Sequence, residues 1–181
     1  MRDMYIGIDP GVNGFVAVYM RSDAPGMSGF SFHEMPKIGK LPDMNAINRL
    51  FKSVAVIMDQ DGIKAHACLE DVHAKAQSAA KATFSFGYIV GAIELAVIAN
   101  GIPFTKVAPK LWQKEMWAGI PVQKKPSSTG KTMVNDTKLM SKMAAKRLFP
   151  GMDLRRNARC ANDDDNKIDA LLMCEYCRRK F

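Results

Sequence analysis

The first 35 residues constrain the fold most, because they hold three short apolar runs joined by turns. The run MYIGID at residues 4–9 predicts a buried strand, and FVAVYM at 15–20 predicts a second strand with alternating side chains. The intervening PGVNG favours a tight turn, since Pro fixes φ and Gly allows φ to be positive. After a second turn, FSFHEM at 30–35 predicts a third strand. The chain is therefore expected to begin as a three-stranded meander.

Helices and strands alternate through the rest of the sequence. Apolar side chains recur with helical spacing from Met44 to Met58, directly after Asp43 as the N-cap. The predicted elements are a helix at 43–60, a strand at 65–72, a helix at 78–100, a strand at 103–108, and helices at 109–119, 135–148 and 163–179. This order predicts a mixed α/β fold with five strands, an antiparallel meander leading into a parallel portion. Such a sheet carries its functional sites at the carboxyl ends of its strands.

The charge of the chain is concentrated in one region. Lys and Arg exceed Asp and Glu by 26 − 18, which gives a net charge of +8. Residues 106–160 hold 13 of the basic residues and 3 of the acidic ones, a local +10, so the remainder sums to −2. This distribution predicts an acidic partner, with nucleic acid as the first candidate. Within the region, residues 119–133 have the Gly, Pro, Ser and Lys content of a mobile basic loop.

Length and composition predict one intracellular domain. The domain is expected to span residues 1–181, with 48% hydrophobic residues to form its core. Cys174 and Cys177 form a CxxC without a second pair, so reduced thiols are expected in place of a zinc site. The most apolar stretch, residues 88–99, contains Glu94 and is too short to span a bilayer. We expect a cytoplasmic protein of a prokaryotic cell or a phage-infected host, with no membrane partner.

The long helix predicted at residues 78–100 is apolar around most of its circumference. A helix on the surface of one subunit normally has a single apolar stripe, which faces the core. One face of this helix is expected to meet the sheet, and another to meet either a second subunit or another part of the same chain. Gly87 and Gly91, one turn apart, would allow a close approach. The segment is therefore the candidate interface of a homodimer.

The acidic run NDDDNKIDALLM at residues 162–173 is divided by the helical period. At 100° per residue, Asp165 and Asp169 differ by about 40° around the helix axis, whereas Asp164 lies about 140° from Asp169. Asp165 and Asp169 can therefore face one point. Asp163 and Asp164 are expected at the helix start, where acids cap free N–H groups. A helix that begins one residue later would exchange the roles of Asp164 and Asp165, so both stay candidates.

Two further acids lie at the ends of predicted strands. Asp9 ends the first strand, and Glu70 lies near the end of the fourth. Together with Asp165 and Asp169 they supply four carboxylates, which match two Mg²⁺ ions. Two such ions about 4 Å apart activate water and stabilise the leaving oxygen at a scissile phosphate. Beside a basic surface, this predicts a metal-dependent phosphodiesterase, with Mn²⁺ as an alternative ion.

Four segments together resemble the RuvC-type Holliday junction resolvases. GIDPGVNGFVAV resembles the family's opening, in which an Asp-Pro-Gly turn joins two strands. LEDVHAKAQSAAKATFSFGYIVG resembles its strand-ending Glu and long helix, PKLWQKEMWAG its basic segment, and DNKIDALLM its closing helix. The resemblance covers nearly the whole chain, with the motifs in the family's order. It implies an RNase H-like fold and a homodimer that cuts two strands of a four-way DNA junction symmetrically.

The same resemblance assigns roles to individual residues. Asp9, Glu70, Asp165 and Asp169 fall on the catalytic metal-binding positions. Lys114 matches a family lysine implicated in activity, and Lys125 or Lys124 falls near a second one. The spacing of four between the last two acids is similar to phage relatives, since bacterial enzymes use three and have an acid where this chain has Asn166. His73 stands three residues after Glu70, where the family often has an aromatic side chain that engages the junction centre.

Basic side chains across the charged region are expected to contact the DNA backbone. The candidates, with His73, are Lys110, Lys114, Lys124, Lys125, Lys131, Lys138, Lys142, Arg155 and Arg156. Two alternatives stay open: a non-catalytic basic DNA-binding protein, and an RNase H-like nuclease that acts on other branched or flap substrates. STGKT at 128–132 is not a phosphate-binding P-loop, because position 125 is Lys and no strand leads into it.

Overall fold

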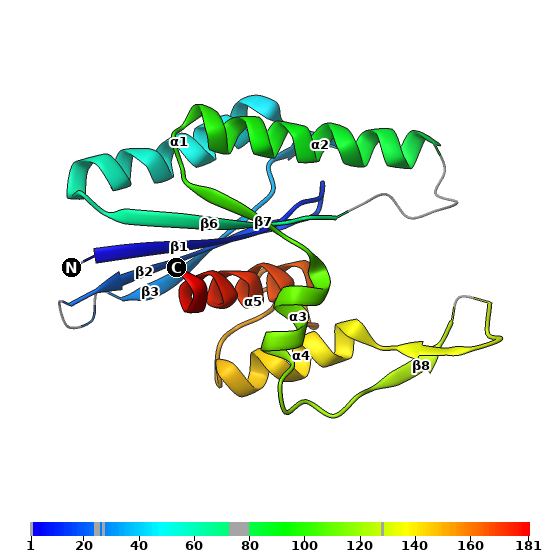
Figure 1. The fold of residues 1–181 in the computed structure, drawn as a ribbon. Coiled ribbons are helices and arrows are strands. Elements are labelled where there is room, and N and C mark those ends of the chain that lie inside the picture. Colours follow the sequence, from blue (N-terminus) through cyan, green and yellow to red (C-terminus); the bar gives the residue numbers. More distant parts are fainter. Residues whose placement is uncertain (1, 24–25, 27, 73–79, 128) are drawn as a thin grey trace.

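One five-stranded mixed sheet forms the centre of the structure, a computed structural model (Figure 1). The structure describes residues 2–23, 26, 28–72, 80–127 and 129–181. The strand order is β3-β2-β1-β6-β7. These strands are β1 (Arg2–Asp9), β2 (Phe15–Ser22), β3 (Gly29–Glu34), β6 (Lys64–Glu70) and β7 (Phe104–Val107). β1, β2 and β3 pair antiparallel, whereas β6 runs parallel to both β1 and β7. The predicted α/β fold, with its meander and parallel portion, is confirmed.

Two pairs of short strands and five helices complete the described part of the chain. The short strands are β4 (Lys37–Ile38) with β5 (Leu41–Pro42), and β8 (Lys124–Pro126) with β9 (Met133–Asn135). The helices are α1 (Met44–Asp61), α2 (Ala80–Ala99), α3 (Pro109–Met116), α4 (Thr137–Leu148) and α5 (Asp165–Lys180). Asp43 caps α1 by accepting a hydrogen bond from the Ala46 backbone, as predicted.

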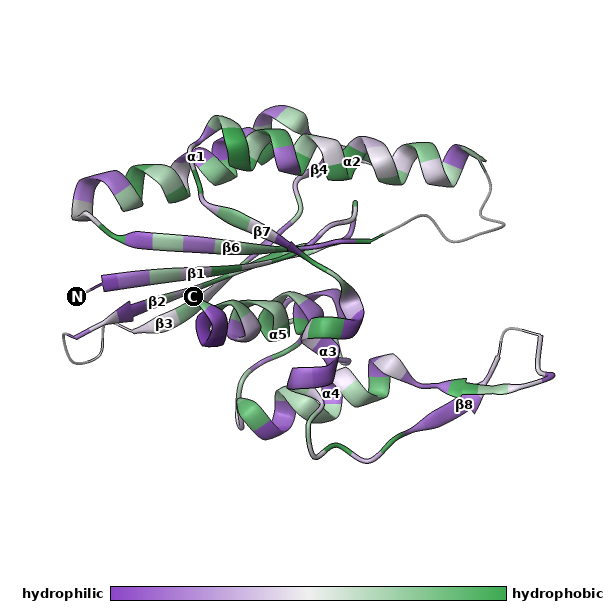
Figure 2. Ribbon diagram, in the orientation of Figure 1, coloured by the Kyte–Doolittle hydropathy of each residue, from purple (hydrophilic) through white to green (hydrophobic). Residues whose placement is uncertain are grey.

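The helices form two layers on opposite faces of the sheet (Figure 1). α1 and α2 cover one face, where Phe51 of α1 and Ile93 of α2 pack in the same core as Ile6 of β1. α5 covers the other face, with α3 and α4 beyond it, in a second core that includes Trp112 and Leu171. Figure 2 shows hydrophobic residues along the central strands. β1 supplies Ile6 to the first core and Tyr5 to the second, and β6 supplies Leu69 and Cys68 in the same way. This burial accounts for the apolar character of β1 and β6.

The turn between β1 and β2 depends on a glycine. The register pairs Asp9 with Phe15, and the Gly14 amide donates to the Gly11 carbonyl at 2.9 Å. A Cβ on Gly14 would lie 2.1 Å from the Asp9 carbonyl oxygen, so only glycine fits there. The turn therefore ends β1 at Asp9 and fixes the position of that residue at the edge of the sheet.

α5 approaches β1 more closely than ordinary side chains would permit. A Cβ on Gly7 would lie 2.2 Å from both the Ala170 carbonyl oxygen and the Cys174 amide nitrogen. Gly7 is fully enclosed in the sheet, and the backbone of the helix rests directly on it. This contact sets the height and register of α5 over the strand that ends at Asp9.

Three expectations from the sequence need correction. Residues 119–133 do not form a plain loop, because β8 and β9 pair there as a hairpin. α2 is 20 residues long, so the segment is not too short to span a bilayer. By length and composition it is long and apolar enough, although Ile89, Ile93 and Val97 are buried against the sheet. The last helix begins at Asp165 with Asp164 as its N-cap, two residues after the predicted start.

Three of the four cysteines lie in the core beneath α5. Cys68, Cys174 and Cys177 are buried and Cys160 is partly exposed, all four as free thiols. The Cys174 thiol donates to the Tyr5 carbonyl and the Cys177 thiol to the His66 carbonyl. Burial raises the pKa of the Cys174 thiol above its ordinary value. These thiols therefore join α5 to the sheet as small core residues.

Candidate active site

Two carboxylates end neighbouring parallel strands at the same edge of the sheet. Asp9 is the last residue of β1, and Glu70 is the last residue of β6. The register that aligns Ile8 with Leu69 puts these two acids side by side. Both side chains are partly buried. The strand ends therefore bring together two residues that are 61 positions apart in the sequence, as the sequence analysis predicts.

A third carboxylate comes from the helix that covers the sheet. Asp169 lies in the second turn of α5, next to Ala170, whose carbonyl contacts Gly7 of β1. Asp169 Oδ1 is buried and has no hydrogen-bond partner within the described residues. A buried carboxylate oxygen without a donor costs free energy unless a cation or another donor compensates it. Asp169 therefore has a buried oxygen that a bound cation could compensate.

Burial and repulsion from neighbouring acids raise the pKa of both Asp9 and Asp169. Burial raises the pKa of Asp9 well above its ordinary value, and repulsion from Asp169, Glu70 and Asp164 raises it further. Burial likewise raises the pKa of Asp169 to about 7, with repulsion from Glu70 and Asp165 adding to it. Charged groups crowded into a partly buried site behave in this way when no counter-ion is close. Clusters of this kind are typical of functional sites.

Glu70 is oriented by an indole. Trp112 of α3 is fully buried, and its Nε1 donates to Glu70 Oε1 at 2.9 Å. Burial raises the pKa of Glu70, while this hydrogen bond lowers it. Trp112 thus favours the charged form and fixes the rotamer of the carboxylate at the strand end. The sequence marks Trp112 only as part of an amphipathic basic segment, so its role was missed.

Each acid of the Asp163–Asp165 run has a different partner. Asp164 Oδ1 accepts from the Asn166 and Lys167 amides at 3.0 and 3.1 Å, while its Oδ2 accepts from Arg156 at 2.7 Å. Asp163 pairs with Lys142 at 2.9 Å and Lys146 at 3.2 Å. Asp164 therefore caps the helix, as predicted, whereas Asp163 lies one residue before the cap.

Asp165 belongs to the site side of the helix. Its carboxylate pairs with Lys138 Nζ at 2.6 Å, and it lies close enough to Asp169 to raise the pKa of that residue. Asp164 lies close enough to Asp9 to raise the pKa of Asp9. The carboxylate of Asp164, however, already accepts hydrogen bonds from the Asn166 and Lys167 amides and from Arg156. Among the described residues, Asp165 has one ion pair to give up, the exposed pair with Lys138. It is therefore the better candidate for a ligand.

α4 contributes two residues to the cluster. Lys138 and Ser141, three positions apart, share one face of this helix. A hydrogen bond from Ser141 and the charge of Lys138 both lower the pKa of Asp169, against the effect of burial. The Ser141 hydroxyl also accepts from Trp117 Nε1 at 3.3 Å. Lys138 was expected to contact the DNA backbone; the structure places it among the carboxylates. The sequence analysis did not predict a role for Ser141. Its spacing of three from Lys138 indicates that both side chains lie on one face of the helix.

The carboxylates have the donor chemistry of a divalent cation site. Oxygen ligands, partial burial and an unsatisfied Asp169 oxygen fit a hard ion such as Mg²⁺ or Mn²⁺. As the side chains stand, no three His, Cys, Asp or Glu residues in the described part of the chain are grouped closely enough to hold one ion. Sharing an ion would therefore require rotation of these side chains. The side chain of Asp165 is half-exposed and so has room to rotate, whereas that of Asp9 is held by burial.

Some of the predicted phosphate contacts are engaged within the protein. Arg155 pairs with Asp153 at 2.8 Å. Arg156 bridges Asp164 and Glu34, with its guanidinium over the ring of Phe15. Arg156 also donates to the Asn13 carbonyl at 2.9 Å, so it holds the segment that precedes α5 against the β1–β2 turn. Lys142 is likewise paired, with Asp163. His73 lies outside the described residues.

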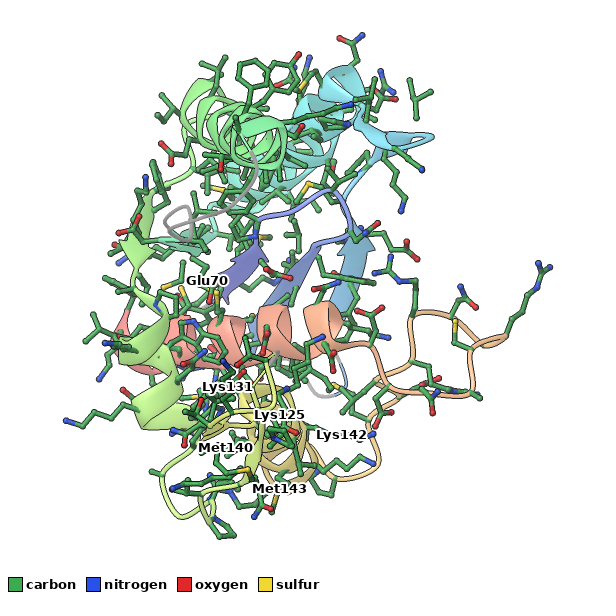
Figure 3. The ribbon with its side chains drawn as sticks, turned by 90° about the vertical axis from the view of Figure 1, so that its right-hand side faces the viewer. Glu70, Lys125, Lys131, Met140, Lys142 and Met143 are labelled. Carbon is green, nitrogen blue, oxygen red and sulfur yellow. The ribbon has the colours of Figure 1, made fainter. Side chains whose placement is uncertain are left out.

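Other predicted contacts are exposed at the end of the molecule where Glu70 lies. Figure 3 views this end and labels Glu70 with Lys125, Lys131 and Lys142. Lys124 and Lys131 are exposed on the β8–β9 hairpin, while Lys125 pairs with Asp136 at 2.9 Å. Lys110 and Lys114 are exposed on α3. Lys114 has no ion pair to the site acids within the described residues, so its predicted role is not supported by a direct contact.

Comparison with known proteins identifies the fold. No protein-family model and no curated protein sequence matches the chain. Among solved structures, it is similar to RuvC of Thermus thermophilus, with 15% identity and a TM-score of 0.51 over 94% of this chain and 90% of that one. A second structure is T. thermophilus RuvC in complex with a Holliday junction substrate, with 14% identity and a TM-score of 0.50 over 95% and 90%. The yeast mitochondrial Holliday junction resolvase Ydc2 is more distant, with 12% identity and a TM-score of 0.44 over 97% and 85%.

The likeness to RuvC confirms the fold expected from the sequence motifs. The chain has a RuvC-like, RNase H-like fold, with a mixed five-stranded sheet between layers of helices. At identities of 14–15% the comparison establishes the fold alone. What the site does must be argued from its own residues.

Proposed function

We propose that this protein is a metal-dependent endonuclease that hydrolyses phosphodiester bonds in branched DNA, with the four-way junction as its first substrate. One observation carries the proposal: Asp9, Glu70 and Asp169, from two strand ends and a helix, lie close enough to raise the pKa of Asp9, at the end of the molecule where Lys131 is exposed. Buried acids that raise one another's pKa favour a bound cation. A surface with exposed lysines beside them favours a polyanion.

Two Mg²⁺ or Mn²⁺ ions per site would be held by Asp9, Glu70, Asp165 and Asp169. When bound, such ions activate a water molecule and stabilise the charge of the leaving oxygen at a scissile phosphate. The chain's own residues hold the ligands. Trp112 orients Glu70, Ser141 restrains Asp169, and the Gly7–Ala170 contact fixes the helix over the strands.

Lys138 would orient the scissile phosphate. Its ammonium is 2.6 Å from Asp165 and also acts on Asp169, so it lies beside the proposed ligands. The pair is largely exposed, so breaking it costs under about 1 kcal/mol. Once Asp165 turned to an ion, Lys138 would be released to a phosphate oxygen at the same place. Lys110 and Lys114 of α3, with Lys124 and Lys131 of the hairpin, would bind the flanking backbone.

A second subunit would pack on the outer face of α2. Four large apolar side chains of this helix are exposed: Phe84 at 74%, Tyr88 at 55%, Leu95 at 67% and Ile98 at 60%. A Cβ on Gly87 or Gly91 would meet nothing within 4 Å, so their backbone is open to a partner. A groove of about 650 Å³ runs between α1 and this face. An exposed apolar face of this size is typical of a protein interface.

A non-catalytic branched-DNA-binding protein is the second candidate. It is favoured by the separation of the carboxylates, since no three acidic, His or Cys side chains of the described residues are grouped to hold one ion. On that view the acids would repel the DNA backbone without a metal to compensate them. The two candidates differ in one outcome, strand cleavage.

The test compares the wild type with the Asp9→Asn/Asp169→Asn double variant. Binding to a labelled four-way junction is measured in Ca²⁺, and cleavage in Mg²⁺ and in Mn²⁺. We expect the variant to bind the junction but lose cleavage by at least about 10³-fold. Cleavage by the variant at the wild-type rate would refute the catalytic assignment. Binding without cleavage by the wild type in either metal would establish the second candidate.

A further inference from the structure

The β8–β9 hairpin extends from the body of the protein as an arm. The arm comprises residues 123–136, of which residue 128 lies outside the description. Its base is closed by the Asp136 amide on the Gln123 carbonyl at 2.8 Å, and its far end by the Ser127 amide on the Thr132 carbonyl at 2.8 Å. Figure 1 shows the arm projecting beyond α4, on the side where β1 and β6 end.

The arm is tied to the helix that carries Lys138. Asp136 is the N-cap of α4, and its Oδ1 accepts from the Leu139 amide. The same oxygen pairs with Lys125 of β8 at 2.9 Å. Lys138, two residues after this cap, reaches Asp165. The arm therefore has a fixed connection to the proposed active site.

Strand pairing divides the arm into two faces. The register places Lys124 opposite Asn135 and Pro126 opposite Met133, and these four alternate with the pair Lys125 and Val134. Side chains at alternate positions share a face. All four residues of the first face are exposed, with Met133 at 58%. Figure 2 shows the contrast between hydrophilic β8 and hydrophobic β9.

The composition of the arm indicates which kind of partner it would bind. Residues 123–136 contain three Lys and one Asp, and Asp136 pairs with Lys125, so Lys124 and Lys131 supply the net charge of +2. A protein that bound only the phosphates of a continuous duplex would need lysines alone. The exposed Met133 and Pro126 add apolar surface, and such side chains act in DNA-binding proteins as wedges against base steps. Bases are open to such contact where strands exchange.

The arm also has the reach that this partner needs. Three residues separate Asp136 from Met133, which spans about 10 Å at about 3.3 Å per residue. A base contacted by Met133 would therefore lie within roughly one turn of the duplex from a phosphate held beside Lys138. Lys124 lies on the same face as Met133 and faces the same partner.

We propose that the arm recognises the branch point of DNA, with Met133 and Pro126 against an exposed base and Lys124 and Lys131 on the adjacent phosphates. The proposal rests on the proposed function, since it names how that site would select its substrate. It concerns recognition and not the chemical step. It can therefore be tested in the absence of cleavage.

The test measures affinity for a four-way junction and for a linear duplex of equal length, in Ca²⁺, at several salt concentrations. We expect Met133→Gln to weaken junction binding by about tenfold, the low end for loss of one base contact, with duplex binding changed less than about twofold. We expect Lys124→Gln/Lys131→Gln to weaken both and to reduce the salt slope by about 2. The matched control is Val56→Gln, at an exposed apolar position on α1 in the opposite layer.

A second readout locates the contact. A 2-aminopurine base at the branch point should change its fluorescence on binding the wild type and respond less to Met133→Gln. Unchanged junction affinity in this variant, or equal loss for junction and duplex, would overturn the proposal. If the wild type cleaves the junction but Met133→Gln leaves selectivity unchanged, the proposed role of the arm is rejected and the nuclease is not. Selective binding that depends on Met133, without cleavage, would reject the nuclease alone.

Discussion

Replacing Asp169 by Asn should stabilise the protein at neutral and alkaline pH when divalent ions are absent. Asp169 has a buried Oδ1 without a partner, and burial raises its pKa to about 7 from the ordinary 3.8. A pKa raised in the folded state means that folding favours the neutral carboxyl. This contribution is complete below about pH 4, and it is lost as the pH rises through 7. The unfolding free energy of the wild type should therefore fall across this range.

The size of the effect follows from the same pKa. Each pH unit between the folded and unfolded values corresponds to about 1.4 kcal/mol, so ionising Asp169 costs the folded state up to about 4 kcal/mol. Relaxation and water entry reduce this figure. We expect Asp169→Asn to gain about 2–4 kcal/mol at pH 8, which raises Tm by about 5–10 °C for a chain of this length. At pH 4 both side chains are neutral, so the difference should nearly vanish.

The assay is thermal unfolding followed by circular dichroism at pH 4, 6 and 8 in EDTA. The matched control is Asp59→Asn, at an exposed position on α1, which should leave Tm unchanged at each pH. Adding Mg²⁺ at pH 8 should stabilise the wild type and have less effect on Asp169→Asn. A variant less stable than the wild type at pH 8 in EDTA would refute the reasoning, as would a difference independent of pH.

Three further changes test other parts of the structure. Gly7→Ala should destabilise the fold by more than about 3 kcal/mol in chemical denaturation, because its Cβ would meet the backbone of α5 at 2.2 Å, whereas Gly29→Ala, with open space around it, should be nearly neutral. Trp112→Phe should lower cleavage several-fold more at pH 6 than at pH 8, because loss of the hydrogen bond to Glu70 raises the pKa of that carboxylate; an equal loss at both pH values would argue against it. Leu95→Glu should convert a dimer to a monomer in light scattering, and a monomeric wild type would contradict the proposed interface.

The order of strands and helices was predictable because each element has a local signal. The β1–β2 turn has its glycines, α1 has helical spacing and an N-cap at Asp43, and the strands are short apolar runs between turns. The two strand-end acids were also predictable, because parallel strands end at one edge. β8 and β9 were not, since three-residue strands are shorter than any periodic pattern.

The details of the site depended on contacts between distant residues. The helical period correctly separated Asp163 and Asp164 from Asp165, but the partners of these acids come from α4 and from Arg156. Lys138 has the same local pattern as any exposed lysine, and only the packing of α4 on α5 brings it to the carboxylates. The hydrogen bond from Trp112 to Glu70 joins residues 42 positions apart. No local rule predicts such pairs.

The products formed from a labelled four-way junction show whether the protein is the proposed nuclease. The wild type is incubated in Mg²⁺ with four-way, three-way, flap and linear substrates, and each strand is followed separately. The account predicts paired nicks placed symmetrically across the four-way junction, absent with Asp9→Asn and absent on the linear duplex. Equal cutting of flaps would broaden the substrate class. Failure to cut any branched substrate in Mg²⁺ or Mn²⁺, by protein that binds the junction, would contradict the account.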